Sequence, residues 1–207
     1  MSEIQIDYQD LKRALNQQRR ASYIRLQGGW PVAMAGFFYW AALGVYGVSA
    51  SLYEWAMAAY MGSGLIFPVA VGLSQLAGRS LFGTRQLVGF VAVPAIIGML
   101  LFWPIVVAAG HMQAYALIPL ILAIGMGIHW PVIGWSYGRV LLYSMHAAVR
   151  GIAVLLIWMY LPEARLTLMP LAVAAIYGVT ILAILIDVRA KSRGLRSTDD
   201  KQDPDRD

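Results

Sequence analysis

The hydrophobic positions of this chain gather into long apolar stretches separated by short polar segments. We place six stretches, at residues 30–50, 54–77, 86–109, 113–137, 141–161 and 168–187. Each is close to the length of about 20 residues with which a helix crosses the hydrocarbon core of a bilayer. The pattern therefore predicts an all-α, polytopic membrane helix bundle with six transmembrane helices, in which the short links make consecutive helices neighbours.

The basic residues are unevenly shared between the two sets of linking segments. Fourteen Lys and Arg lie in segments that would face one side of the membrane, and only Arg165 lies in a segment that would face the other. Because cytoplasmic segments carry an excess of Lys and Arg, both termini are predicted to be cytoplasmic. The chain has no Cys, which is compatible with the bacterial inner membrane that we expect.

The transmembrane domain of residues 30–187 is flanked by two polar segments. Residues 188–207 are basic and then strongly polar, and we expect disorder from Ser197 onward. Residues 1–29 carry an apolar stripe at helical spacing beside basic residues, formed by Ile4, Tyr8, Leu11 and Leu15. This predicts an amphipathic helix on the cytoplasmic leaflet, and pairing with a partner helix is the alternative.

Gly and Pro recur at matching places in the second and fourth stretches. The segments GSGLIFPV and GMGIHWPV lie 63 residues apart, either by duplication or through a shared packing need. On a helix they generate two stripes of small residues, Gly64, Pro68 and Gly72 in one span and Gly127, Pro131, Gly134 and Gly138 in the other. Such faces let helices approach closely, and we expect a homo-oligomer formed through them.

Proline also occurs inside three consecutive stretches, at Pro68, Pro94, Pro104, Pro119 and Pro131. Each proline removes a backbone donor and crowds the carbonyl four residues earlier. Kinks are therefore predicted in the second, third and fourth helices. Kinked membrane helices serve packing in some proteins and line a solute path in others.

The fifth stretch carries a polar face inside the membrane. Tyr143, His146 and Arg150 lie on one side of a helix there, and no stretch contains an Asp or Glu in its interior. An Arg facing lipid at the bilayer centre costs about 2.5–3.5 kcal/mol. We therefore expect Arg150 to reach the cytoplasmic interface, or to meet a carbonyl, a hydroxyl, a lipid phosphate or an anionic ligand.

The fourth stretch adds His129 and Ser136, which share a face one heptad apart. With the polar face of the fifth stretch, they form a candidate solute cavity open to the cytoplasm, lined by Arg150, His146, Tyr143, His129 and Ser136. The three His residues lack the spacing of a metal site, and we find no phosphate loop, nucleophile elbow or paired carboxylates. We expect no catalysis, cofactor or metal.

Several short motifs resemble a family of small, uncharacterised bacterial integral membrane proteins. They are Ile66-Phe67-Pro68, Leu81-Phe82 with Leu87-Val88-Gly89, and His129-x-Pro131 followed by Trp135 and Tyr143. The resemblance implies membrane architecture and bacterial origin, and it supplies no activity.

Two functional classes remain open from the sequence. One is binding or transport of a small solute, with an anion as the candidate class, which needs a cavity that reaches Arg150. The other is a non-catalytic scaffold or sensor whose N-terminal helix reads lipid or a partner protein. A lipid-acting enzyme is a minor third. Membrane lipids are expected partners, and nucleic acid is not, because the basic residues lie at span ends.

Overall fold

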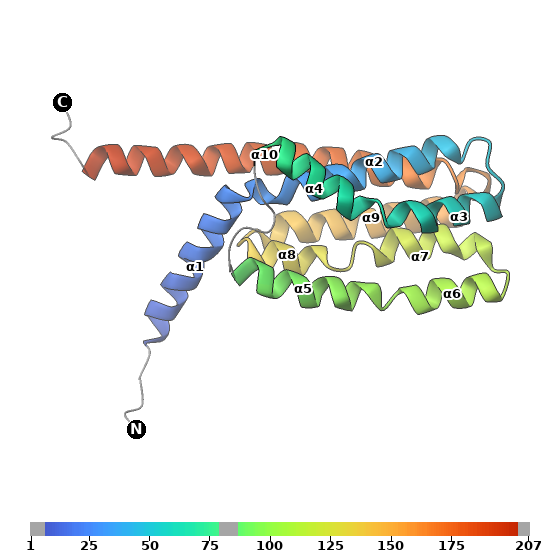
Figure 1. The fold of residues 1–207 in the computed structure, drawn as a ribbon, viewed down its shortest axis with the longest axis horizontal. Helices are drawn as coiled ribbons and strands as arrows, with labels where there is room; N and C mark the ends of the chain where they lie inside the picture. The colour runs from blue at the N-terminus through green and yellow to red at the C-terminus, as the bar shows by residue number, and fades with distance from the viewer. Residues whose placement is uncertain (1–6, 79–86, 203–207) are drawn as a thin grey trace, which may run out of the picture.

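The computed structural model describes residues 7–78 and 87–202, with side chains for 7–78 and 90–193. Ile4 of the amphipathic stripe and the Leu81-Phe82 motif lie outside these residues. Within the described ranges the secondary structure is entirely helical (Figure 1), which confirms the all-α prediction. The helices are α1 Tyr8–Arg25, η1 Gln27–Gly29, α2 Trp30–Tyr46, α3 Leu52–Ser63, α4 Ile66–Leu76, α5 Leu87–Leu100, α6 Trp103–His111, η2 Tyr115–Leu117, α7 Ile118–Gly125, α8 Trp130–Ser136, α9 Val140–Tyr160, η3 Pro162–Ala164 and α10 Leu168–Gln202.

The described residues contain four to five helical segments that are long and apolar enough to cross a membrane. Four lie at Phe90–His111, Tyr115–Ser136, Val140–Tyr160 and Leu168–Arg193. The fifth is the pair α3 and α4, which meet at a bend of 46°. The remaining apolar stretch folds as α2, whose 17 residues extend about 26 Å at 1.5 Å per residue.

The helices pack around α2, α9 and α10. One side of α2 packs along α10 and its other side supports α3 and α4, while α9 packs against α10, α7 and α8. The outermost pair, α5 and α6, packs on α8 and α7 (Figure 1). Close approach of α2 to α10 depends on Gly44, where a Cβ would lie 2.6 Å from Leu171 Cγ. The buried core includes Trp40, Trp55 and Val154.

The predicted kinks occur as three helix breaks at similar depth. The first separates α3 from α4 at Gly64 and Leu65, the second separates α5 from α6 after Leu100, and the third separates α7 from α8 between Gly125 and Trp130. Pro104 and Pro131 lie in the first turns of α6 and α8, where the missing N–H costs no helical hydrogen bond. The breaks leave backbone groups available to side chains.

The two small-residue stripes have different surroundings. In the fourth span, a Cβ at Gly127 would lie 3.3 Å from Arg150 Cζ, and one at Gly134 would lie 2.6 Å from Tyr143 Cβ. In the second span, a Cβ at Gly72 would meet nothing within 4 Å, and one at Gly64 only a carbonyl of its own helix at 3.6 Å. The stripe in the fourth span is thus a packing face within the chain, whereas the stripe in the second span is left uncovered by the described residues.

Both described ends of the chain leave the same end of the bundle (Figure 1). There α1 runs at a steep angle to the bundle axis, whereas α10 continues along its own direction. The helical backbone of α10 reaches Gln202, beyond Ser197, where the polar composition predicted disorder. Extending a helix that a buried span has already nucleated adds one hydrogen bond for each residue fixed, which favours continued helix here.

Candidate functional site

Arg150 lies at the centre of the bundle with 0% of its surface exposed. Its Nε donates to the carbonyl of Ala123 at 2.5 Å, and its Nη1 donates to the hydroxyl of Tyr177 at 3.1 Å. The guanidinium carbon lies 5.5 Å from the ring centroid of Trp40 and 5.6 Å from that of Tyr177. Arg150 therefore does not extend to the cytoplasmic interface, and a carbonyl and a hydroxyl hold it, as two of the sequence alternatives predicted.

The break between α7 and α8 explains why the Ala123 carbonyl is available. In a continuous helix the amide of Gly127 would donate to that carbonyl, but here it donates to Ile124 at 2.9 Å. The absence of a side chain at Gly127 gives the guanidinium its room. The helix break and the buried Arg therefore form one local structure.

The charge of Arg150 has no carboxylate partner within the described residues. The two ion pairs found there join Arg13 to Asp10 and Arg139 to Asp187. Arg150 Nη2 also has no hydrogen-bond partner in the same ranges. Removing an ion from water costs several kcal/mol unless an opposite charge or hydrogen bonds compensate. The site therefore holds positive charge and free N–H donors in its interior.

His146 lies one turn before Arg150 on the same face of α9. Its Nδ1 is 2.8 Å from the Thr180 hydroxyl oxygen, and that hydroxyl donates its single hydrogen to the carbonyl of Ile176 at 2.7 Å. Nδ1 must therefore be the donor of the His146–Thr180 bond, which leaves the lone pair of the neutral ring on Nε2. The His146 ring stacks on Trp130, with 4.1 Å between centroids, and meets the ring of Tyr177 at 4.7 Å.

A cavity of about 400 Å³ adjoins this cluster. Its walls come from α2, α3, α4, α5, α6, α8 and α10, and residues at all three helix breaks line it, including Gly64, Phe102 and Met126. Ser63, His129, Trp130 and Tyr177 are its polar lining residues, and the Trp130 ring centroid lies 6.1 Å from that of His129 and 5.5 Å from that of Tyr177. His129 Nδ1 and Trp130 Nε1 are buried there without a hydrogen-bond partner among the described residues.

The chain belongs to the DUF7010 family.

The model of this family, which is one of unknown function, matches residues 15–187. This confirms the resemblance to an uncharacterised family that the Gly, Pro and aromatic motifs indicated. No curated protein and no solved structure matches the chain.

The DUF7010 fold separates the five predicted cavity residues into three groups. His129 lines the cavity, whereas Arg150 and His146 lie behind Tyr177 and Trp130 and contact them. Ser136 is buried, and its hydroxyl donates to Ile133 within its own helix at 2.7 Å. The fifth residue, Tyr143, is buried in the first turn of α9. Neither Ser136 nor Tyr143 is among the residues that line this cavity.

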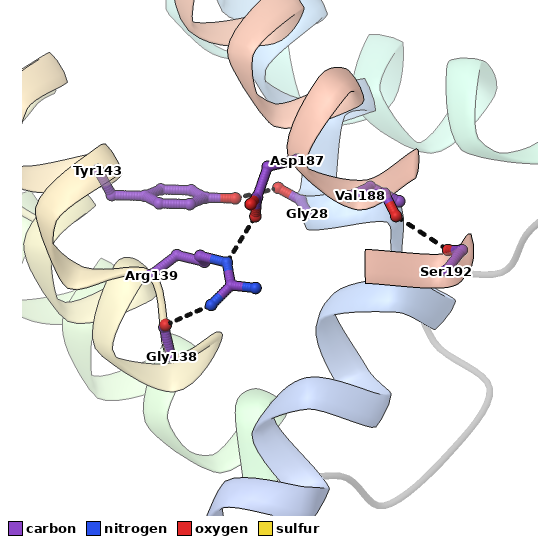
Figure 2. A network of polar contacts seen from close by, with 7 residues as sticks. All are labelled: Gly28, Gly138, Arg139, Tyr143, Asp187, Val188 and Ser192. Atoms are coloured by element: carbon purple, nitrogen blue, oxygen red, sulfur yellow. Dashed lines mark hydrogen bonds and ion pairs between the residues drawn. The ribbon is translucent and has the colours of Figure 1, made fainter. Parts of the chain in front are cut away.

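Tyr143 instead belongs to a polar network that ties η1, α9 and α10 together (Figure 2). Its hydroxyl donates to the carbonyl of Gly28 at 2.5 Å, and Arg139 Nε donates to Asp187 Oδ2 at 2.5 Å. Gly28 has a φ of 63°, which favours glycine, and a Cβ there would lie 2.5 Å from Ile184 Cγ2. The network closes this end of the bundle around the start of α2.

The same end of the DUF7010 bundle holds the last turns of α1. Tyr23 is fully buried, and Arg139 lies 4.9 Å from its ring centroid. Burial and the nearby Asp187 carboxylate raise the pKa of the Tyr23 hydroxyl well above its ordinary value. Arg19 Nε donates to the carbonyl of Trp135 at 2.6 Å, at the C-terminal end of α8. These contacts hold the C-terminal turns of α1 against the bundle.

Sequence reasoning missed Tyr177 and Thr180, both on α10. They are polar residues three positions apart inside an apolar stretch, which places them on one helix face. That signal could have marked them as partners for the polar face of the fifth stretch. What the sequence could not supply is that α10, rather than another helix, packs against this face of α9.

Proposed function

We propose that this DUF7010 protein is a six-span membrane protein that binds a small anionic solute in the cavity beside Arg150. One observation carries the proposal: Arg150 is completely buried, no carboxylate pairs with it in the described residues, and its Nη2 has no hydrogen-bond partner there. Its Nη1 donates to Tyr177, which lines the cavity wall. The cation is therefore separated from the cavity by one side chain.

Electrostatics support an anion as the ligand class. Tyr177 and the Ala123 carbonyl give Arg150 neutral acceptors, which satisfy hydrogen bonds without cancelling the charge. In a low-dielectric interior an anion nearby recovers part of the desolvation cost of the guanidinium. Trp130, whose Nε1–H is buried without a hydrogen-bond partner among the described residues, also lines the cavity. The lining contains no carboxylate that would repel an anion, and we propose no catalytic role.

The arrangement of the termini supports six spans. Because the described ends of the chain leave the same end of the bundle (Figure 1), the number of crossings must be even. Four segments are long and apolar enough to cross by themselves, and the bent pair α3–α4 is the fifth candidate span. The short helix α2, crossing once, makes six. Together with the distribution of Lys and Arg, this supports cytoplasmic termini in a bacterial inner membrane.

The proposal includes membrane lipids and a second copy of the chain as partners. Tyr8 is 70% exposed and Leu11 is 56% exposed on α1, whose steep angle to the bundle axis suits a helix lying along the leaflet. The uncovered small-residue face of α4 can approach another copy closely. Leucine at Gly72, where nothing lies within 4 Å, is expected to lower the oligomeric mass measured by light scattering in detergent.

The test of the solute site is a thermal-unfolding screen of the purified protein against small anions. A ligand at a hundredfold excess over its dissociation constant stabilises the native state by about 2.7 kcal/mol. We expect at least one anion to raise the unfolding midpoint of the parent and of Arg20→Leu, which removes an exposed charge on α1, but not that of Arg150→Leu.

A second variant keeps the test decisive if Arg150→Leu does not fold. Trp130→Phe removes a cavity N–H that has no partner in the described residues, and we expect it to weaken anion binding about fivefold or more while the protein stays folded. The proposal fails if no anion stabilises the parent. It also fails if the same anion stabilises Arg150→Leu or Trp130→Phe as strongly as the parent.

A further inference from the structure

The walls of the cavity beside Arg150 are mostly apolar. Ile66 and Phe67 come from α4, Met99 from α5, and Phe102 and Trp103 from the second helix break. The volume of about 400 Å³ lies within the range of about 300–1,000 Å³ typical of sites for organic ligands. A small inorganic anion would leave most of this apolar wall without contacts. The occupant therefore needs an apolar body.

The cavity reaches the outer surface of the bundle at α2, α4 and α5. Four large apolar lining residues remain substantially exposed there: Phe67 at 58% on α4, Leu100 at 45% and Ile96 at 40% on α5, and Val32 at 41% on α2. Ile96 and Leu100 belong to the apolar segment Phe90–His111, so this opening lies at the depth of the hydrocarbon core under the proposed topology. A hydrophilic ion cannot reach such an opening through lipid, whereas an amphipathic molecule partitions into the bilayer and can.

The polar lining residues of the cavity are equipped to hold a single anionic head group. The Tyr177 hydroxyl accepts a hydrogen bond from Arg150, so its own hydrogen is oriented by that cation and can be donated into the cavity. Trp130, a neighbour of Tyr177 in the lining, carries a buried Nε1–H that has no partner in the described residues. One guanidinium stands behind these donors, which suits one negative charge.

Building on the proposed function, we infer that the ligand is an amphipathic anion, with one carboxylate or phosphate head and an apolar tail, that enters from the bilayer where the cavity reaches the surface at α2, α4 and α5. The head lies against Trp130 and Tyr177 in the field of Arg150. The tail lies along the aromatic wall at the helix breaks. This assigns both the class of ligand and its route.

The experiment measures binding of radiolabelled decanoate to the full chain in lipid nanodiscs, with empty nanodiscs subtracted. Acetate, decanol and decyl phosphate serve as competitors, because acetate has the head without the tail and decanol has the tail without the charge. We expect saturable decanoate binding that decyl phosphate competes for and that acetate does not. Decanol should compete at least tenfold more weakly than unlabelled decanoate.

A matched pair of variants tests the position of the tail. Gly64 has φ −64° and ψ −22°, so Gly64→Leu keeps an ordinary backbone conformation and directs its side chain into open space beside the cavity lining. Gly110→Leu adds the same side chain on α6, where nothing lies within 4 Å and no lining residue of the cavity is changed. Gly64→Leu should weaken decanoate binding at least tenfold, and Gly110→Leu should leave it unchanged.

The outcomes separate this inference from the proposed function. If acetate competes as well as unlabelled decanoate, or if Gly64→Leu binds decanoate normally, the amphipathic class is wrong while an anion site at Arg150 stands. If decanol competes as well as unlabelled decanoate, the charge of the head is irrelevant and the anion site itself fails. If decanoate does not bind but a hydrophilic anion does, only the inference is overturned.

Discussion

At the scale of single residues, the centre of this protein is organised by the hydrogen-bonding needs of Arg150. The five N–H groups of a guanidinium require several acceptors, and the described residues supply two, from Ala123 and Tyr177. His146 is held in one tautomer by Thr180. The sequence showed that His146 and Arg150 share a face, because helical periodicity requires it. It could not show their partners, because these come from other helices.

The close contact between Gly127 and the Arg150 guanidinium leads to a prediction. A Cβ at this position would lie 3.2 Å from the Ile124 carbonyl oxygen and 3.3 Å from Arg150 Cζ. We expect Gly127→Val to displace the guanidinium from the Ala123 carbonyl and to destabilise the protein by about 1–3 kcal/mol. Unfolding in detergent measures the change, with Gly110→Val as the control in open space. Equal stability of the two variants would show that the guanidinium does not need the space left by the missing side chain at Gly127.

The Thr180 hydroxyl leads to a second prediction at this scale. Thr180→Val has a similar shape but removes the acceptor of His146 Nδ1–H. We expect the single Nδ1–H tautomer of the parent to become a mixture, visible in ¹⁵N chemical shifts of the His146 ring, with a loss of about 1–2 kcal/mol in stability. Thr167→Val, which removes a hydroxyl bonded only within its own turn, is the control. An Nε2–H tautomer in the parent would contradict the assignment.

At the scale of elements, helix breaks decide what the helices can do. The breaks between α3 and α4, α5 and α6, and α7 and α8 lie against one cavity. Proline positions predicted interruptions in these three helices, and this was confirmed. They did not predict where each interruption would fall, because Pro94 stays inside α5 while Pro119 lies in the first turn of α7. Neighbouring helices decide which proline interrupts the ladder.

The contact between the start of α9 and α10 supports a prediction for the Arg139–Asp187 pair. Their side chains are 25% and 33% exposed, so solvent screens the pair only in part. A double-mutant cycle with Arg139→Gln and Asp187→Asn should give a coupling free energy of about 1 kcal/mol that decreases as salt is raised. The exposed pair Arg13–Asp10 is the internal reference and should give about 0.3–0.5 kcal/mol. A coupling free energy no larger than this reference would mean that the Arg139–Asp187 pair does not help to hold α9 and α10 together.

At the scale of the whole molecule, the topology leads to a labelling prediction. Because the chain contains no Cys, single cysteines can be labelled without background. Glu163→Cys in the link before α10 should react with an impermeant maleimide added to intact cells, since this link lies on the outer side in the proposed topology. Gln17→Cys in α1 and Lys191→Cys in α10 should react only after the membrane is opened. Labelling of Glu163→Cys only after opening would reverse the proposed orientation.

The sequence by itself determined the helical class, the apolar stretches and the face shared by His146 and Arg150. These follow from hydrophobicity and from the 3.6-residue period, which are local properties of the chain. Only the tertiary structure decided that Ala123 and Tyr177 hold Arg150, that the small residues of α8 pack within the chain while those of α4 do not, and that three breaks meet at one cavity. The reason is physical: periodicity determines which residues share a face, but in lipid no hydrophobic drive selects which faces meet, so shape and hydrogen bonding between distant segments decide it.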